Sequence, residues 1–329
     1  SRQRQMCIRD RVKLAGVSVE PSRSAAIQLE ALSRHFGEVK AVHALSLEVR
    51  EGELFGLVGP DGAGKTTLLR TLAGLLSPSE GSGMVAGFDL EENPEKVKKQ
   101  IGYMAQQFGL YAELNVVENL RFFADLFDVP KNEISGRMDS LLEFANLTEF
   151  KRRRADQLSG GMQKKLALAC CLIHEPNILL LDEPTTGVDP ISRREFWHIL
   201  GELHLSGTTI VVSTPYMDEA DRCSRVGLMY QGEMIRCATP ADIRGALSSE
   251  MLVLIVEEDQ DLSTILGEVN GIHEVQIYGD AYHLLVDDAA RRKREIARNL
   301  RRKKIKIKDL FASMPKMEQA FISLVKRQE

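Results

Sequence analysis

One stretch of eight residues constrains this chain more than any other. It reads Gly59-Pro60-Asp61-Gly62-Ala63-Gly64-Lys65-Thr66. The apolar residues 54–58 come directly before it and predict a buried strand, and the residues from Thr67 to Ala73 have the apolar spacing of a helix. A glycine-rich loop that joins a strand to a helix in this order is typical of a phosphate-binding loop.

Each part of the octet has a role in that interpretation. Gly62 and Gly64 can adopt backbone angles that other residues avoid, so that successive N–H groups turn inward around an anion. The positive end of the following helix lies at the same point. Lys65 would reach the β- and γ-phosphates of a nucleotide, and the Thr66 hydroxyl would hold Mg²⁺. The alternative, a plain glycine turn, does not account for a lysine and a threonine in this register.

A second cluster of chemistry-bearing residues ends an apolar run. Residues 178–181 are Ile-Leu-Leu-Leu and lead into Asp182 and Glu183. This pattern predicts a central parallel strand with carboxylates at its carboxyl end. There Asp182 would hold Mg²⁺, and Glu183 would orient or deprotonate an attacking water. The alternative is a pair of turn residues, and the phosphate-binding loop upstream favours the metal site.

A weaker signal lies between these motifs. Gln106 follows a strand predicted at 99–105, which is where an open α/β sheet places its ligands, and a loop glutamine is the alternative. Residues 113–146 have helical apolar spacing. We expect this mostly helical segment to be broken at Pro130 and Gly136.

The sequence Ser159-Gly160-Gly161 precedes a helix predicted over 164–173. Ser159 fits the N-cap of that helix, and the paired glycines would leave backbone N–H groups free for an anion. Such a cap is common in any fold, and its place in a chain with a phosphate-binding loop gives it weight.

Phe36 lies between two alternating apolar and polar runs, 27–32 and 44–49, which predict half-buried antiparallel strands. An aromatic ring in this place would either stack on a purine base or belong to the core. The phosphate-binding loop downstream favours the purine.

Together these motifs resemble the nucleotide-binding subunit of an ATP-binding-cassette (ABC) transporter, over about residues 27–240. Leu158-Ser159-Gly160-Gly161 is the signature that separates this family from other enzymes with the loop. The resemblance implies that residues 59–67 hold ATP. It also implies the following roles: adenine stacking for Phe36, sensing of Mg²⁺ and of the membrane partner for Gln106, metal binding for Asp182, catalytic base for Glu183, and the D-loop for Gly187-Val188-Asp189. Such subunits pair head to tail, and the signature helix of one caps the ATP of the other.

Two positions depart from the family pattern. The family normally has a histidine after the strand that ends at Ser213, and this chain has Pro215 there. Proline offers no side-chain donor to a γ-phosphate, so we expect slow hydrolysis. Asp61 stands where the family more often has asparagine, and a carboxylate near phosphates is unfavourable unless it points away.

The fold class predicted is α/β: an ABC-type cassette with a mixed sheet, an antiparallel β subdomain and a helical subdomain, followed by a small α+β domain. We expect an unassigned arm at 1–26, the ATP-binding domain at 27–245 with its helical subdomain at about 107–160, and the accessory domain at 246–329. The last domain is predicted as strands at 251–257, 275–278, 282–286 and 305–310 and helices at 262–269, 289–300 and 317–325. Its order, β-α-β-β-α-β, suggests a ferredoxin-like module. It resembles the extension of drug- and antibiotic-export subunits.

Composition narrows the classes of function. The chain has 329 residues with a net charge of −4, and no apolar run approaches the roughly 20 residues that span a bilayer. We expect no signal peptide, since residues 1–24 are basic and polar, and we expect the five cysteines to be reduced thiols. The basic run 291–304 is interpreted as a solvated helix face, with anionic lipid or an acidic partner as the alternative. Nucleic acid is not expected, because no aromatic residues are interleaved with that run.

The predicted function is therefore an ATPase subunit, with ATP and Mg²⁺, that dimerises and drives a separate membrane permease. The permease would dock near Gln106–Leu120 and hold the chain at the inner face of the plasma membrane. By resemblance the cargo is a drug or another small hydrophobic compound. Two alternatives stay open: a module that binds nucleotide and hydrolyses it weakly beside an intact cassette, and a non-transport ABC protein of ribosome or DNA repair type.

Overall fold

The computed structural model describes residues 24–107, 109–246, 250–257, 261–267 and 269–326. This part of the chain divides into two compact units between Cys237 and Ala238. The domain boundaries inferred from the sequence, at residues 26 and 245, stay predictions. Most of the predicted arm, residues 1–23, lies outside the described residues.

The first unit is built on a six-stranded sheet in the order β10-β9-β3-β8-β7-β6. β3 pairs in parallel with β8 and β9, and β7 pairs in parallel with β6 and β8. Its strands are β3 (Leu54–Val58), β6 (Ile101–Met104), β7 (Ile178–Asp182), β8 (Thr209–Thr214), β9 (Arg225–Tyr230) and β10 (Glu233–Ala238). Every residue of β3, β7 and β8 is buried, as expected for parallel strands covered on both faces. The carboxyl ends of these three strands therefore meet at one edge of the sheet.

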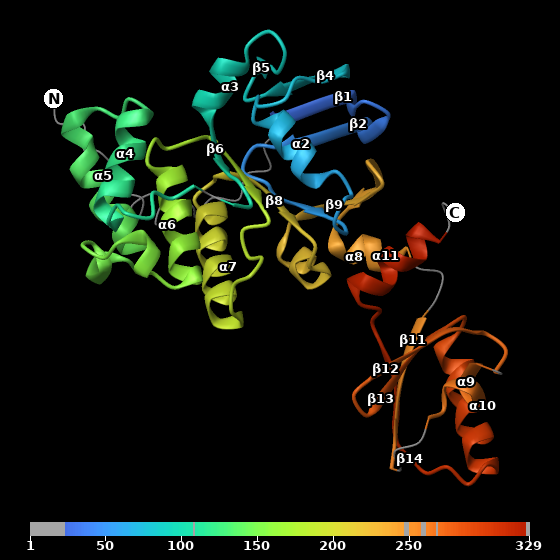
Figure 1. The fold of residues 1–329 in the computed structure, drawn as a ribbon. Helices are drawn as coiled ribbons and strands as arrows, with labels where there is room; N and C mark the ends of the chain where they lie inside the picture. The colour runs from blue at the N-terminus through green and yellow to red at the C-terminus, as the bar shows by residue number, and fades with distance from the viewer. Residues whose placement is uncertain (1–23, 108, 247–249, 258–260, 268, 327–329) are drawn as a thin grey trace. The chain divides into compact units, whose positions relative to one another are not determined.

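Helices connect the strands of this sheet, and the helices that follow β3 and β7 begin at that edge. They are α2 (Lys65–Leu72), α3 (Pro94–Gln100), α6 (Gly160–Leu172) and α7 (Pro190–Leu205). Figure 1 shows α6 and α7 side by side, and the two helices contact each other. The strand predicted at 99–105 is shorter than expected, because Lys99 and Gln100 belong to α3.

A second, antiparallel sheet has the order β2-β1-β4-β5. It contains β1 (Ala25–Phe36), β2 (Val39–Arg50), β4 (Glu80–Val85) and β5 (Phe88–Asp89). The antiparallel pairing expected of the segments around residues 27–32 and 44–49 is confirmed. Leu29 and Val49 from this sheet share one apolar core with Phe55 of β3 and Leu68 of α2, so the second sheet packs against the helix that follows the glycine loop.

The helical subdomain contains α4 (Val116–Leu126) and α5 (Lys131–Phe144), with short 3-10 turns at Thr148–Phe150 and Ala155–Gln157. Pro130 is the N-cap of α5, so the predicted break at this proline is confirmed. The predicted break at Gly136 is wrong, since Gly136 lies inside α5. Glycine costs a helix interior only about 1 kcal/mol relative to alanine, and the buried side chains of Ile134 and Met138 offset that cost.

The second unit contains a four-stranded antiparallel sheet in the order β12-β13-β11-β14. Its elements are α8 (Pro240–Gly245), β11 (Glu250–Val256), α9 (Ser263–Gly267), β12 (Ile272–Tyr278), β13 (Ala281–Val286), α10 (Ala289–Arg302), β14 (Ile307–Ser313) and α11 (Met317–Val325). An apolar core joins α9 and α10 to the sheet through Leu254, Leu266, Leu284 and Ile296. From β11 to β14 the chain therefore runs β-α-β-β-α-β, as the sequence predicts.

Among the described helices, none is both long enough and apolar enough to cross a membrane.

Candidate functional site

The octet forms the loop between β3 and the N-terminus of α2, and its glycines are required by geometry. Gly62 and Gly64 have φ of +79° and +99°, in the left-handed region that favours glycine, so the expectation for both residues is confirmed. A Cβ on Gly64 would lie 2.2 Å from the carbonyl oxygen of Ala41. A Cβ on Gly59 would lie 2.2 Å from the carbonyl oxygen of Met229. The loop is therefore pressed between two other backbone segments, and side chains cannot enter it at either point.

Lys65 lies folded back over this loop. Its side chain is 3% exposed, and its Nζ donates hydrogen bonds of 2.9 Å to the carbonyl oxygens of Gly59 and Pro60. The same nitrogen lies 3.4 Å from Oε1 of Glu183, which is also buried. A buried amine is stable here because it has two carbonyl acceptors and one carboxylate within reach.

The other residues of the octet differ in exposure. Asp61 is exposed, whereas Ala63 is buried, and Thr67 is half-buried with its carbonyl oxygen bonded to the Thr71 hydroxyl. The Asp61 carboxylate therefore lies at the surface of the loop.

Asp182 sits at the end of β7 and is fully buried. Its Oδ1 accepts hydrogen bonds from the Thr66 hydroxyl at 3.1 Å and from the Ser213 hydroxyl at 2.7 Å. Oδ2 is buried, and none of the described residues donates a hydrogen bond to it. A buried carboxylate oxygen without a donor, beside a threonine hydroxyl, is a donor set that suits Mg²⁺. The residues present therefore fit the metal that the sequence predicts.

Glu183 is held by both its backbone and its side chain. Its φ of +47° is unusual for a residue other than glycine, and its N–H is directed at the Ser213 carbonyl oxygen at 3.2 Å and at the Ser213 hydroxyl at 3.0 Å. Its Oε2 accepts from Gln106 Nε2 at 2.9 Å and from the Thr186 hydroxyl at 3.3 Å. Left-handed backbone at such a position costs about 1–3 kcal/mol and persists only where surrounding bonds impose it.

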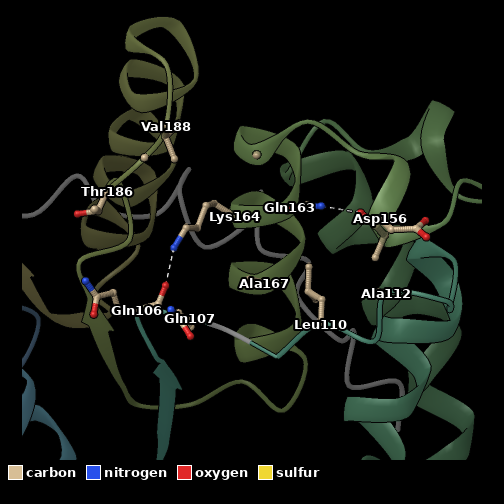
Figure 2. Close-up of a pocket in the computed structure, with 13 residues that line it drawn as sticks. Gln106, Gln107, Leu110, Ala112, Asp156, Gln163, Lys164, Ala167, Thr186 and Val188 are labelled. Carbon is tan, nitrogen blue, oxygen red and sulfur yellow. Dashed lines mark hydrogen bonds between the residues drawn. The ribbon is translucent and has the colours of Figure 1, made fainter.

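A cavity of about 450 Å³ lies beside this cluster, between Gln106, the first turns of α6 and the loop after β7 (Figure 2). Figure 2 shows Lys164 reaching from α6 toward Gln106, and its Nζ donates to the Gln106 carbonyl oxygen at 2.9 Å. Burial lowers the pKa of Lys164, against an opposing effect from the carboxylates of Asp182 and Glu183. Lys164 of α6 thus binds the backbone of Gln106, whose side chain binds Glu183.

The signature residues begin α6. Ser159 is the N-cap, and its hydroxyl accepts from Met162 N at 3.3 Å, so the predicted cap is confirmed. The helix begins at Gly160 and not at Lys164, because a glycine pair fits the first turn of a capped helix. A Cβ on Gly161 would lie 2.3 Å from the Ser192 hydroxyl oxygen, which shows how closely α6 and α7 approach.

Asp189 caps α7 by accepting from Ile191 N at 3.1 Å and Ser192 N at 3.0 Å. These hydrogen bonds, with Ser192 contributing most, hold the pKa of the Asp189 carboxyl below its ordinary value. Among the described residues, no hydrogen bond or ion pair joins Ser159 or Asp189 to the octet. The structure therefore brings Lys65, Thr66, Gln106, Asp182 and Glu183 together, and leaves the two helix caps apart from them.

Two other predicted positions lie on different elements. Phe36 ends β1, is 46% exposed, and has the Arg34 guanidinium 4.8 Å from its ring centroid. Its exposure excludes it from the core, which was the alternative interpretation. Pro215 is half-buried and directly follows β8.

Sequence reasoning missed three residues of the cluster. Ser213 binds both Asp182 and the Glu183 backbone, Thr186 binds the Glu183 carboxylate, and Lys164 binds Gln106. Ser213 had a usable signal, since it is a polar residue near the end of an apolar strand, at the same sheet edge as the acidic pair. Thr186 and Lys164 had none, because loop and helix positions do not reveal their neighbours across the fold.

Comparisons with known proteins match the same segment. A family model described as "ABC transporter" matches residues 42–186. The chain is 41% identical over 224 residues to the probable multidrug ABC transporter ATP-binding protein YbhF of Escherichia coli strain K12, which is 68% of this chain and 39% of that protein. The chain thus spans about two fifths of the length of that relative.

A second relative is matched over nearly its full length. The daunorubicin resistance ATP-binding protein DrrA2 of Streptomyces coeruleorubidus is 33% identical over 304 residues, covering 91% of this chain and 94% of that protein. Among solved structures, the dimeric post-hydrolysis state of the ATP-binding cassette MJ0796 bound to ADP and Pi has a TM-score of 0.59 and 28% identity. That match covers 65% of this chain and 98% of the solved one.

Proposed function

Since the chain belongs to the family of ABC transporter ATP-binding proteins, we propose that it hydrolyses Mg-ATP to power a separate membrane permease. One observation carries the proposal. Lys65 and Thr66 of the glycine loop lie against the acidic pair at the end of β7, at 3.4 Å from Glu183 and 3.1 Å from Asp182. The site thus combines a cation, a hydroxyl and two carboxylates with a glycine-rich loop. This arrangement suits a polyphosphate together with its metal ion.

The octet and Phe36 would make the contacts that bind the nucleotide. The backbone N–H groups of residues 61, 62 and 64–66, at the N-terminus of α2, would face the phosphates with Lys65 beside them, whereas the N–H groups of Gly59 and Ala63 already donate to carbonyl oxygens. Exchange of the Glu183 contact for a phosphate oxygen keeps the amine paired. Phe36 offers an exposed ring for stacking on adenine. Asp61 is exposed and so can point its carboxylate away from the phosphates.

Thr66, Asp182 and Gln106 would hold Mg²⁺, as the fit of the buried Asp182 carboxylate supports. When bound, the metal supplies positive charge against the phosphate oxygens. Gln106 already donates to Glu183, so its side chain lies beside the predicted base.

Glu183 would act on the attacking water. Its side chain is 7% exposed and is oriented by Gln106 and Thr186 through Oε2, which leaves Oε1 near Lys65. Once the amine turns to a phosphate, Oε1 becomes the free acceptor for a water proton. A base held by two donors and an imposed backbone has little freedom to leave that position.

A second cassette would complete the site. Gly160 is exposed at the N-terminus of α6, and a Cβ there would meet nothing within 4 Å, so the end of this helix is open to a partner. We propose a head-to-tail pair in which Ser159, Gly160, Gly161 and Asp189 face the ATP of the partner cassette. The dimeric MJ0796 cassette supports this proposal.

The permease would dock on the segment Gln106–Leu120 and the start of the helical subdomain. Tyr111 is 46% exposed, and its ring centroid lies 4.4 Å from that of Phe122, which is 37% exposed. Two exposed aromatic rings in contact with each other suit a partner helix. This contact would hold the chain peripherally at the inner face of the plasma membrane. We propose export of drugs or other small hydrophobic compounds, and the names of the two relatives, a multidrug ABC transporter protein and a daunorubicin resistance protein, support a drug as the cargo.

We propose a ferredoxin-like class for the second unit. The chain order β-α-β-β-α-β and the antiparallel sheet order β12-β13-β11-β14 support it.

Pro215 favours a second candidate, a nucleotide-binding module with weak turnover beside an intact cassette. A proline side chain has no donor for a γ-phosphate, so one interaction that would stabilise the transition state is missing. The cluster around Glu183 supports the hydrolytic role over this candidate.

The experiment that tests the proposal compares the purified chain with Glu183→Gln. We expect ATP hydrolysis by the parent and a fall of about 100-fold or more in kcat for Glu183→Gln, because the amide cannot accept a proton. ATP affinity should stay within about twofold, since Glu183 is not the phosphate ligand. Phosphate release measures kcat, and titration calorimetry measures affinity. Equal turnover in the two proteins would remove Glu183 from its role.

A further inference from the structure

A buried carboxylate outside the predicted motifs lies at the centre of a second polar network. Glu219 belongs to the 3-10 turn Met217–Arg222 and is 1% exposed. Its Oε1 accepts from the Thr185 hydroxyl at 2.8 Å, from Trp197 Nε1 at 2.8 Å and from Arg193 Nε at 2.6 Å. Its Oε2 accepts from the Thr214 hydroxyl at 2.6 Å. One carboxylate thus satisfies four donors from three separate elements.

Those donors lie next to the residues of the candidate site. Thr185 is two residues after Glu183 in the chain, and Thr214 ends β8 directly after Ser213. Arg193 and Trp197 lie in α7, the helix that Asp189 caps. Glu219 therefore joins the ends of β7 and β8 to the helix after the D-loop.

The segment around Pro215 depends on the same network. The Thr214 hydroxyl donates to Glu219 and also accepts from Tyr216 N at 3.0 Å, so the chain turns around this hydroxyl. Arg193 binds both carboxylate oxygens of Asp218 at 3.0 Å, and its guanidinium lies 4.3 Å from the Tyr216 ring centroid. Pro215 lies between two anchored neighbours.

A carboxylate this buried needs its partners, because removal of one leaves an unpaired charge or an unsatisfied donor. The same network fixes the backbone that presents Glu183. Ser213 of β8 accepts from the Glu183 N–H, and Glu219 accepts from the hydroxyls of Thr185 and of Thr214, which ends β8. A base must be positioned closely, and a misplacement of about 1 Å can reduce a rate about 100-fold.

We propose that Glu219 is a positioning residue for ATP hydrolysis, which sets the ends of β7 and β8 and so the place of Glu183 and Pro215. The inference rests on the proposed function. Glu219 does not touch the octet; it acts through Thr185 and Thr214. Its negative charge is paired with Arg193, so the same carboxylate also links α7 to the strand ends.

Four variants test this. Glu219→Gln keeps the shape and removes the charge, whereas Glu219→Asp keeps the charge on a shorter side chain that cannot reach Thr185 and Thr214 together. Thr185→Val and Thr214→Val each remove one hydroxyl and leave Glu219 paired with Arg193. The control is Glu202→Gln, an acid on α7 whose side chain is 48% exposed.

We expect kcat to fall about tenfold or more for Glu219→Gln, Glu219→Asp and Thr214→Val, while KM and the ATP affinity stay within about twofold. Thr185→Val should behave in the same way. Glu202→Gln should match the parent. A merely structural role would lower the melting temperature and leave kcat per folded molecule unchanged, and that result would overturn the proposal. If Glu219→Gln does not fold, the two threonine variants decide by the same criterion.

Hydrogen exchange gives a readout that does not need turnover. In Glu219→Gln, amides in 182–188 and 212–217 should exchange faster than in the parent and in Glu202→Gln, while amides of 54–58 should not. Unchanged exchange in both segments would overturn the inference. If Glu219→Gln shows this exchange pattern while the parent does not hydrolyse ATP, the proposed function is refuted, and only the role of Glu219 in holding the ends of β7 and β8 stands.

Discussion

At position 183 a single residue is constrained from two directions. Ser213 holds the backbone N–H, and Gln106 and Thr186 hold the carboxylate, while φ stays at +47°. The sequence predicted the carboxylate and its place at the end of a strand, because an apolar run into two acids is a strong local pattern. It did not predict the left-handed backbone, since that conformation is imposed by β8, which lies 30 residues away in the chain.

The site around Asp182 shows the same limit. The octet identified Thr66 as a metal ligand from its place after Lys65, and the Thr66–Asp182 hydrogen bond is consistent with that prediction, which remains to be tested with the metal. Thr186 and Lys164 were missed because their importance comes from neighbours that only the folded chain provides, whereas Ser213 could have been noticed as a polar residue near the end of an apolar strand. A local motif predicts that two groups act together only when they are close in the sequence, as in one loop.

At Pro215 we predict a gain of function. Pro215→His should raise kcat by about tenfold to 100-fold, because an imidazole N–H can donate to a γ-phosphate, and a hydrogen bond to a charged group is worth about 1.5–3 kcal/mol. Steady-state phosphate release measures the effect.

Pro215→Ala is the matched control, since it removes the ring without adding a donor. If Pro215→His gave no more turnover than Pro215→Ala, the absence of a side-chain donor would not be what limits hydrolysis.

Among the elements, strands were easier to predict than the starts of helices. β3, β7 and β8 are short apolar runs with polar ends, and the structure has them within one residue of the predicted bounds. The predicted start of α6 was too late, because Gly160 and Gly161 were left out of the helix, and the predicted break in α5 at Gly136 was wrong. Glycine is a weak helix breaker, and a cap such as Ser159 or packing such as that of Ile134 overrides it.

Four strands, β4, β5, β9 and β10, were not predicted, since their residues lack a strong apolar alternation.

The contact between α6 and α7 gives a prediction at the scale of elements. Gly161→Ala places a methyl group where the Ser192 hydroxyl and Cβ lie, at 2.3 and 2.4 Å. We expect a loss of about 1–2 kcal/mol in the free energy of unfolding, because overpacking of about 1–3 kcal/mol exceeds the helix propensity gained from alanine. Chemical denaturation measures it.

Gly160→Ala is the neighbouring control, since a Cβ there meets nothing within 4 Å, and its stability should be unchanged or slightly higher. Gly161→Ala combined with Ser192→Gly should recover most of the loss. A Gly161→Ala protein as stable as the parent would contradict the close approach of the two helices.

For the whole molecule, the cassette fold predicted from a few motifs is confirmed, because those motifs constrain the order of strand, loop and helix around one sheet. The second unit was predicted from periodicity alone, and its element order is as expected. Its sheet order could not be predicted, since antiparallel pairing between strands far apart in the chain is decided by packing and not by local pattern.

The central claim is that the chain takes up Mg-ATP through the glycine loop, and titration calorimetry of the purified chain tests it most directly. We predict saturable binding by the parent and a loss of about 100-fold or more in affinity for Lys65→Ala, because a buried amine that pairs with phosphate is removed. Lys131→Ala, an exposed lysine at the start of α5, is the control and should retain binding within about threefold. Affinity unchanged in Lys65→Ala, or no heat of binding in the parent, would contradict the account.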